Sequence, residues 1–229
     1  MPTPAEVVST FEKRITTTLA LHDELIVAVN QKKRQRSLET MLAEQCVLGL
    51  AVLWEAFVHD LFVAFIVARP EICMRFHRDK ITQSIEAKGK PLIKWVRITL
   101  PPSLSRDQIE LLVDPDGWNI TARSAEDLAK RANQLLTAAH AKKFSLPVPD
   151  RAFLDLITAI RNYLSHRSSG SLTATKQRLR ELAIADAASP LNGNMTTIGA
   201  YLKERPGTAV HSRAKLIGHM LSGLSSKLI

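Results

Sequence analysis

Three side chains with complementary chemistry stand close together in the segment 161–166. Arg161, Asn162 and His166 supply a permanent cation, an amide and an imidazole that titrates near neutral pH. A guanidinium can bind two phosphate oxygens at once, and a histidine can exchange protons with a reacting group. Residues of these types at this spacing therefore suit a phosphodiester substrate.

The helix that must position these side chains is predicted over 151–166. Its apolar residues fall on one stripe, formed by Phe153, Leu156, Ile157, Ile160 and Leu164. At about 100° per residue, Asn162 points away from this stripe, His166 lies within about 40° of Asn162, and Arg161 lies at the edge of the stripe. We expect all three to face outward, toward a cleft, a ligand or another subunit. The alternative is an ordinary solvated surface, on which His166 complements the helix dipole.

Charge and composition point to a globular chain with an anionic partner. The 229 residues suit one large domain or two small ones, and the 45% hydrophobic content is ordinary for a folded protein. The formal net charge of +9 favours nucleic acid or an anionic membrane surface as a partner. Residues 150–229 carry 11 Lys and Arg against 5 Asp and Glu, whereas residues 1–149 carry 20 against 17. The basic excess therefore accompanies the segment 161–166.

Cysteine use and terminal signals exclude several classes. Cys46 and Cys73 are too few for a disulfide framework and do not form a CxxC metal motif, so we expect two buried free thiols. The N-terminus lacks the basic-then-apolar plan of a signal peptide. A glycine-rich phosphate loop is also missing from the sequence, so a nucleotide-hydrolysing or kinase function has no support.

The most apolar segment, 47–67, is interrupted near its middle by Glu55, His59 and Asp60. Charged groups are costly at the centre of a bilayer, so we expect a buried core helix rather than a membrane span. The chain is therefore expected in the cytoplasm, with no membrane partner. Glu55, His59 and Asp60 lack further ligands at the spacing that zinc requires, and neither a metal nor another cofactor is expected.

Helical periodicity dominates the chain and predicts an all-α bundle. The short segment 95–99 is the one strand candidate. Residues 79–121, rich in Gly and Pro, are interpreted as an insertion, and residues 190–229 as a helical tail of a single domain over 1–229. The predicted helices cover 4–31, 38–68 with a short continuation to 76, 105–113, 124–140, 151–166, 173–185, 196–203 and 210–228.

The segment 156–167 closely resembles the signature helix of the HEPN superfamily. In that family an apolar helix carries an Arg, usually followed by Asn or another polar residue, and a His four to six residues after the Arg. Arg161, Asn162 and His166 match this pattern without departure. A second stretch, 42–62, is similar to the long early helix of bacterial HEPN proteins of the RiboL-PSP type.

The resemblance implies an HEPN-like helical bundle and a metal-independent endoribonuclease that acts as a homodimer on RNA. His166 would act as general base on a ribose 2′-OH or as acid on the leaving 5′-oxygen, and Arg161 would hold the scissile phosphate. Asn162 would orient the phosphate or His166. On the family alone, the implied role is that of a toxin or defence effector, with an antitoxin protein as a further partner.

A dimer also has a geometric rationale. Within one helix Arg161 and His166 lie about 140° apart, so a single copy converges poorly on one phosphate. Two copies about a two-fold axis would bring both groups to each cleft.

Glu55 and His59 share a face of the early helix at spacing i, i+4. Either Glu55 orients Arg161 or His166, or Glu55 and His59 form a buried polar pair that satisfies itself.

Two other classes of function stay open. The first is a catalytically inactive HEPN module that binds RNA or nucleotide, or acts as a dimerising interaction protein. The complete set of Arg161, Asn162 and His166 favours the enzyme over this module, because an inactive copy need not keep all three. The second is a basic DNA-binding regulator, although no helix-turn-helix spacing stands out. His211 and His219 are expected at the surface, and Trp95 in packing rather than in base stacking.

Overall fold

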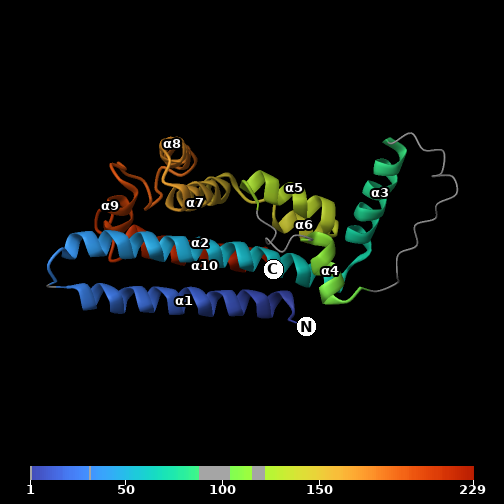
Figure 1. Cartoon of the computed structure of the whole chain (residues 1–229), viewed down its shortest axis with the longest axis horizontal. Coiled ribbons are helices and arrows are strands. Elements are labelled where there is room, and N and C mark those ends of the chain that lie inside the picture. The colour runs from blue at the N-terminus through green and yellow to red at the C-terminus, as the bar shows by residue number, and fades with distance from the viewer. Residues whose placement is uncertain (1, 31, 88–103, 115–121) are drawn as a thin grey trace.

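Two long helices, α1 (Pro4–Val29) and α2 (Gln35–Ala68), run antiparallel along the molecule (Figure 1). The computed structural model describes the chain apart from residues 1, 31, 88–103 and 115–121. α1 begins with a capping box, in which the N–H of Glu6 donates to the Thr3 hydroxyl and the N–H of Thr3 donates to the Glu6 carboxylate. This reciprocal pair satisfies two backbone donors and fixes the start of the helix.

α2 is the central element of the fold. Four helices pack against it: α1, α7 (Val148–His166), α9 (Ile198–Lys203) and α10 (Arg213–Ser225). For this reason its buried residues are distributed around the helix rather than along one stripe. By length and composition α2 could cross a membrane, but 67% of its most apolar stretch is buried inside the structure. Its apolar surface is thus mostly covered by the protein's own helices.

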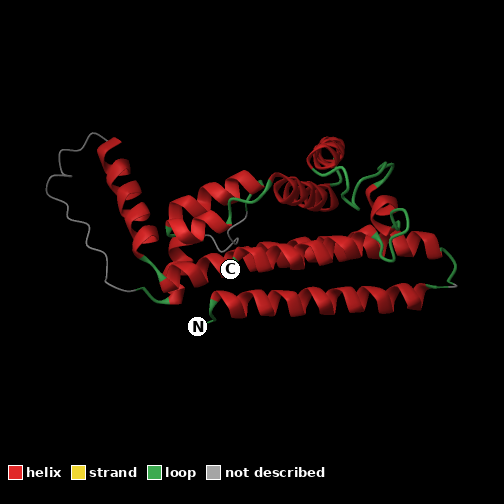
Figure 2. Ribbon diagram, turned by 180° about the vertical axis from the view of Figure 1, so that it is seen from behind, coloured by secondary structure: helices red, strands yellow, loops and turns green. Residues whose placement is uncertain are grey.

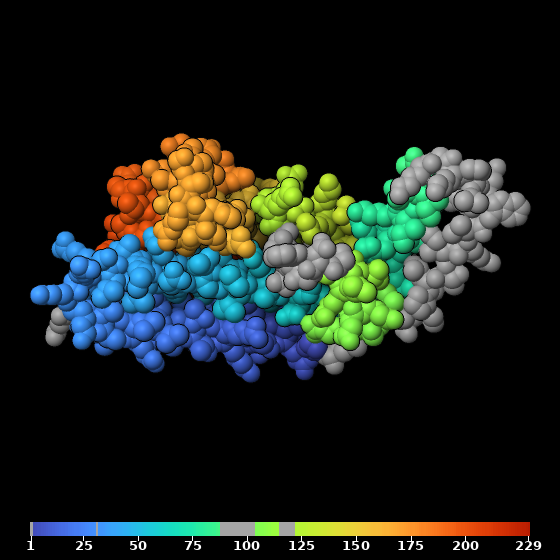
Figure 3. All heavy atoms as spheres, in the orientation of Figure 1, coloured from blue at the N-terminus to red at the C-terminus, as the bar shows by residue number. Residues whose placement is uncertain are grey.

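Residues 148–203 form a second layer of helices on one side of α2 (Figures 2 and 3). α7 (Val148–His166) packs on α2, and α8 (Ser169–Ala185) packs on α7. α9 (Ile198–Lys203) lies on the first half of α2. α10 (Arg213–Ser225) lies against both α1 and α2 and ends in a 3-10 turn, Ser226–Leu228. Every regular element in the described residues is a helix, which confirms the predicted all-α class.

The remaining helices gather at the C-terminal end of α2. They are α3 (Glu71–Ala87), α4 (Arg106–Val113), α5 (Ala125–Leu135) and α6 (Ala138–Lys143). α3 projects from this end of the molecule, and α4 packs against α2 (Figure 1). The strand candidate at 95–99, together with Trp95, lies outside the described residues.

One contiguous hydrophobic core joins α1, α2, α5, α7 and α10. Leu221 and Leu228 expose none of their surface. The predicted tail 190–229 therefore contributes to this core, because α10 packs against both α1 and α2. Cys46 and Cys73 are buried free thiols, as predicted, and burial raises their pKa to about 12 and about 11.

Several helix ends differ from the prediction. α3 is a complete 17-residue helix instead of a short continuation to residue 76, so the first residues of the predicted insertion 79–121 are helical. The helix predicted over 124–140 is two helices, because the Thr137 hydroxyl accepts a backbone hydrogen bond and starts α6. α8 begins before the predicted residue 173, since Ser168 caps it in the same way. Thr137, predicted inside a helix, and Ser168, predicted outside one, therefore both act as caps.

Candidate functional site

The second half of α7 carries the predicted site. The apolar stripe of α7 is buried as the periodicity predicted, with Phe153, Leu156, Ile157, Ile160 and Leu164 all in the core. Burial of this stripe against α2 fixes the rotation of α7 about its axis. The polar residues between the stripe positions are consequently held at defined angles.

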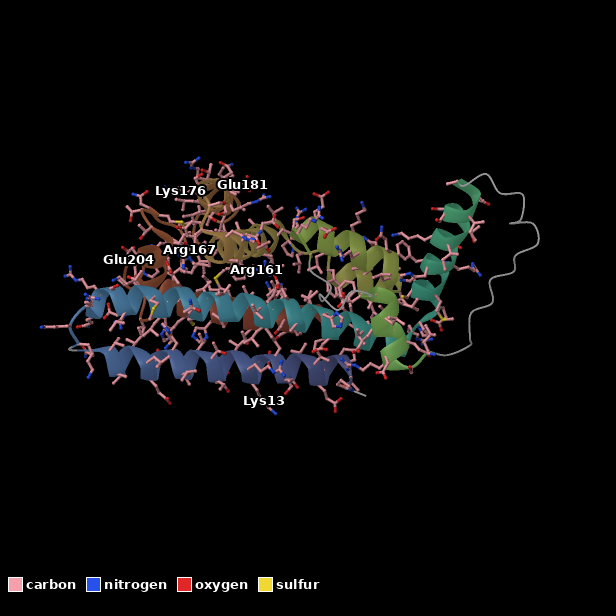
Figure 4. The ribbon with its side chains drawn as sticks, viewed as in Figure 1. Lys13, Arg161, Arg167, Lys176, Glu181 and Glu204 are labelled. Atoms are coloured by element: carbon pink, nitrogen blue, oxygen red, sulfur yellow. The ribbon has the colours of Figure 1, made fainter. Side chains whose placement is uncertain are left out.

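Arg161 reaches from α7 to Glu55 on α2 (Figure 4). Its Nη2 donates a hydrogen bond to Glu55 Oε2 at 3.3 Å. Its Nε lies 3.3 Å from Oε1 but off the line that a hydrogen bond needs, so this contact is electrostatic and the buried Nε has no acceptor among the described residues. The two side chains are 31% and 25% exposed, which leaves the guanidinium accessible from one side.

Asn162 and His166 face outward. Asn162 is exposed, and its Oδ1 accepts a hydrogen bond of 3.3 Å from Arg161 Nη1. His166 is exposed in the last turn of α7 and makes no hydrogen bond or ion pair with any described residue. The structure thus brings Glu55, Arg161 and Asn162 together and leaves His166 apart from them. A single copy thus contains Arg161, Asn162 and His166 but does not bring the imidazole to the other two side chains.

Arg167 forms a second bridge to α2 that sequence reasoning did not assign. It ends α7 in the left-handed conformation, with φ of 51°. Its Nη2 donates to Glu44 Oε2 at 2.6 Å, and this hydrogen bond raises the pKa of Arg167. Its guanidinium also lies 5.5 Å from the centre of the Tyr163 ring. The pair joins residues 123 positions apart, and no local spacing could have predicted it.

Glu55, His59 and Asp60 of α2 lie in three different surroundings. Glu55 is half-buried, and its carboxylate pairs with Arg161. His59 is buried, at 9% exposure, one turn further along α2. Asp60 bonds to Arg106 of α4 at 2.9 Å. Within the described residues, no group of three His, Cys, Asp or Glu side chains is arranged to hold a metal ion.

Two small cavities lie beside the site, on either side of Thr158. The first, about 30 Å³, lies between α2, α5 and α7 and is lined by both Glu55 and Arg161. The second, about 220 Å³, lies between α7, α8 and the start of α5, and Asn162 lines it. Its other polar lining residues are Arg123, Asp155, Thr158, Ser171 and Arg178. The outer face of α7 therefore continues into a polar hollow with two arginines.

Asp155 organises this hollow. Its Oδ1 accepts the backbone N–H of Ala125 at 2.7 Å and so holds the start of α5. Its Oδ2 lies 3.7 Å from Arg178, which also bonds to Glu181 at 2.7 Å. Along α7 the arrangement presents one anchored guanidinium, one amide and one imidazole without a partner among the described residues. No protein-family model, curated protein or solved structure matches this chain.

Proposed function

We propose that this chain is a metal-independent endoribonuclease of HEPN type, whose site is half of a cleft shared by two copies. The observation that carries the proposal is the end of α7. There an anchored Arg161 and an exposed, unpartnered His166 stand on one helix, with Asn162 bonded to the guanidinium. The resemblance of 156–167 to the HEPN signature helix supports the same function.

The chemistry needs little beyond these groups, because RNA carries its own nucleophile in the 2′-OH. His166 would take the proton of the 2′-OH while its oxygen attacks the neighbouring phosphorus, and the bond from phosphorus to the 5′-oxygen would break. A histidine acting as acid would protonate that leaving oxygen. Arg161 would stabilise the negative charge that builds on the phosphate oxygens. The products would be a 2′,3′-cyclic phosphate and a 5′-hydroxyl.

The anchoring of Arg161 is a reason for a shared cleft. Glu55 draws the guanidinium toward α2, whereas His166 lies about 140° around the helix axis and about 7.5 Å further along it. A second copy, related by a two-fold axis, would place its His166 opposite this Arg161. The hollow lined by Arg123 and Arg178 would then receive a neighbouring phosphate of the same RNA strand.

The biological setting belongs to the proposal as well. A cytoplasmic toxin or defence effector, restrained by an antitoxin protein, fits the family resemblance and an RNA substrate. The mostly covered surface of α2 supports its use as a core helix in such a setting.

A catalytically inactive RNA-binding or dimerising module is the second candidate. The Glu55 carboxylate favours it, because a guanidinium already paired at 3.3 Å has less charge to offer a phosphate. Binding of RNA without cleavage would then be the activity of the same surface.

Cleavage of labelled RNA in EDTA separates the two candidates. We expect Arg161→Ala and His166→Ala each to lower the cleavage rate by about 100-fold or more. Arg106→Ala is the matched control for Arg161, since Arg106 is 29% exposed and bonds to a carboxylate of α2 in the same way. His219→Ala, an exposed histidine of α10, is the control for His166. RNA binding without cleavage by the wild type would favour the inactive module.

A further inference from the structure

A pocket of about 470 Å³ lies between α1 and α2 and shares no lining residue with the Arg161 site. It is bounded by the last part of α1, the first part of α2 and the segment that joins α9 to α10. Its volume falls within the range of about 300–1,000 Å³ that small-molecule sites occupy. The residues that line it include His22, Asp23, Glu39, Lys203, Arg205, His211, Ser212 and Lys215.

Cationic groups outnumber anionic groups in this pocket. Lys215 bonds to Asp23 at 2.7 Å, and Lys203 lies 3.8 Å from Glu39. Arg205 forms no ion pair with any described carboxylate. One positive charge therefore remains without a counter-charge at the mouth of the pocket.

His22 lines this pocket without a hydrogen-bond partner among the described residues. Its side chain lines the pocket and is only 6% exposed, yet it makes no hydrogen bond with any described residue. An imidazole that lines a pocket and has no protein partner is available to hydrogen-bond a ligand there. Burial also lowers the pKa of His22, and a neutral imidazole still has one N–H to donate.

The start of α10 adds further donors. Ser212 is the N-cap of this 13-residue helix, but its hydroxyl makes no capping hydrogen bond and lines the pocket instead. The N–H of Arg213 donates to the Glu204 carbonyl at 2.9 Å, whereas the N–H groups of Ala214 and Lys215 lack the side-chain acceptor that caps most of the other helices. A helix N-terminus with free donors and a partial positive charge is suited to an anion.

We propose that this pocket binds the phosphate group of a small phosphomonoester. The first turn of α10, the Ser212 hydroxyl and Arg205 hold the phosphate oxygens, and His22 donates a hydrogen bond from the floor of the pocket. Donors that approach from several directions match a tetrahedral anion better than a planar carboxylate. The volume left beside the phosphate accommodates the organic part of the ligand. This site is independent of the ribonuclease proposal and shares no residue with it.

Titration with inorganic phosphate and with glycerol 2-phosphate, at constant ionic strength, tests the site. The signals of the seven histidine rings are followed by NMR, and His22→Gln identifies that of His22. We expect a saturable shift of the His22 signal with both probes. A shift that grows linearly, or that sodium chloride reproduces, would overturn the proposal.

Substitutions then locate the bound phosphate. We expect Arg205→Met and Ser212→Ala each to weaken binding by about tenfold, because each removes a hydrogen bond to a charged group. Lys13→Met is the matched control, since Lys13 is exposed on α1 outside the pocket (Figure 4). Circular dichroism and thermal unfolding check that the variants fold. Saturable binding that Arg205→Met and Ser212→Ala leave unchanged would contradict the assigned site.

Discussion

At the scale of single residues, Arg161 is both a bridge and a candidate catalytic group. It ties α7 to Glu55 of α2, so its removal affects packing as well as chemistry. Glu55 offers a cleaner test because it contacts the guanidinium and, in the proposed chemistry, takes no direct part in the reaction. If the proposed function holds, the role of Glu55 is to position Arg161, and this role can be separated from folding.

Glu55→Gln is expected to reduce RNA cleavage by about tenfold through loss of orientation at Arg161. The free energy of unfolding should change by about 1 kcal/mol or less, because both partners are a quarter or more exposed to solvent. Urea unfolding measured beside the cleavage assay tests both parts, with Asp60→Asn as the control at the Arg106 bridge. Full activity of Glu55→Gln would remove the positioning role.

His22 makes stability depend on pH. Burial lowers its pKa in the folded chain, whereas the unfolded chain takes up the proton at the ordinary value of 6.5. The stabilisation is thus present above pH 6.5 and is lost as the pH falls toward the folded pKa. Asp23 opposes this shift and Lys215 adds to it.

We expect the wild type to lose more stability between pH 7.5 and pH 5.5 than His22→Gln does. His77, His140 and His219 have lowered pKa values as well, so the difference between the two proteins, rather than the slope of either, isolates His22. Urea unfolding at the two pH values measures it. An equal loss in both proteins would show that His22 does not titrate differently on folding.

At the scale of elements, periodicity predicted most helices and missed what long-range contacts decide. The stripe on α7 was visible because Leu156 and Ile160 repeat at helical spacing. The break between α5 and α6 was missed, since Leu135 and Leu136 continue the apolar pattern up to the cap at Thr137. A threonine that caps a helix cannot be distinguished by its type from one inside a helix. The side-chain hydrogen bond that makes it a cap depends on the fold.

The C-terminal helix provides a test of the single core. Leu221 of α10 is completely buried against α1 and α2, so Leu221→Ala should cost about 2–5 kcal/mol of unfolding free energy. Ile184→Ala is the control, because Ile184 is 86% exposed on α8. Urea unfolding of Leu221→Ala should remain a single transition. A separate early transition would show that residues 190–229 fold apart from α1 and α2.

At the scale of the whole molecule, the candidate site could be predicted from the sequence in part. Helical angles predicted the outward faces of Asn162 and His166. Spacing could not predict the partner of Arg161, because Glu55 is 106 residues away and only the packing of α7 on α2 brings the two together. Helical geometry, by contrast, separates Arg161 from His166 along α7, and for this reason the proposed chemistry calls for a second copy.

Complementation between two inactive variants tests most directly whether the proposed site needs two copies of the chain. Arg161→Ala keeps His166 and His166→Ala keeps Arg161, so a mixed dimer contains one cleft with both groups from different copies. We predict that each variant alone fails to cleave labelled RNA in EDTA, and that mixing them after subunit exchange restores cleavage. A mixture as inactive as either variant alone, with mixed dimers shown to form, would contradict the shared cleft.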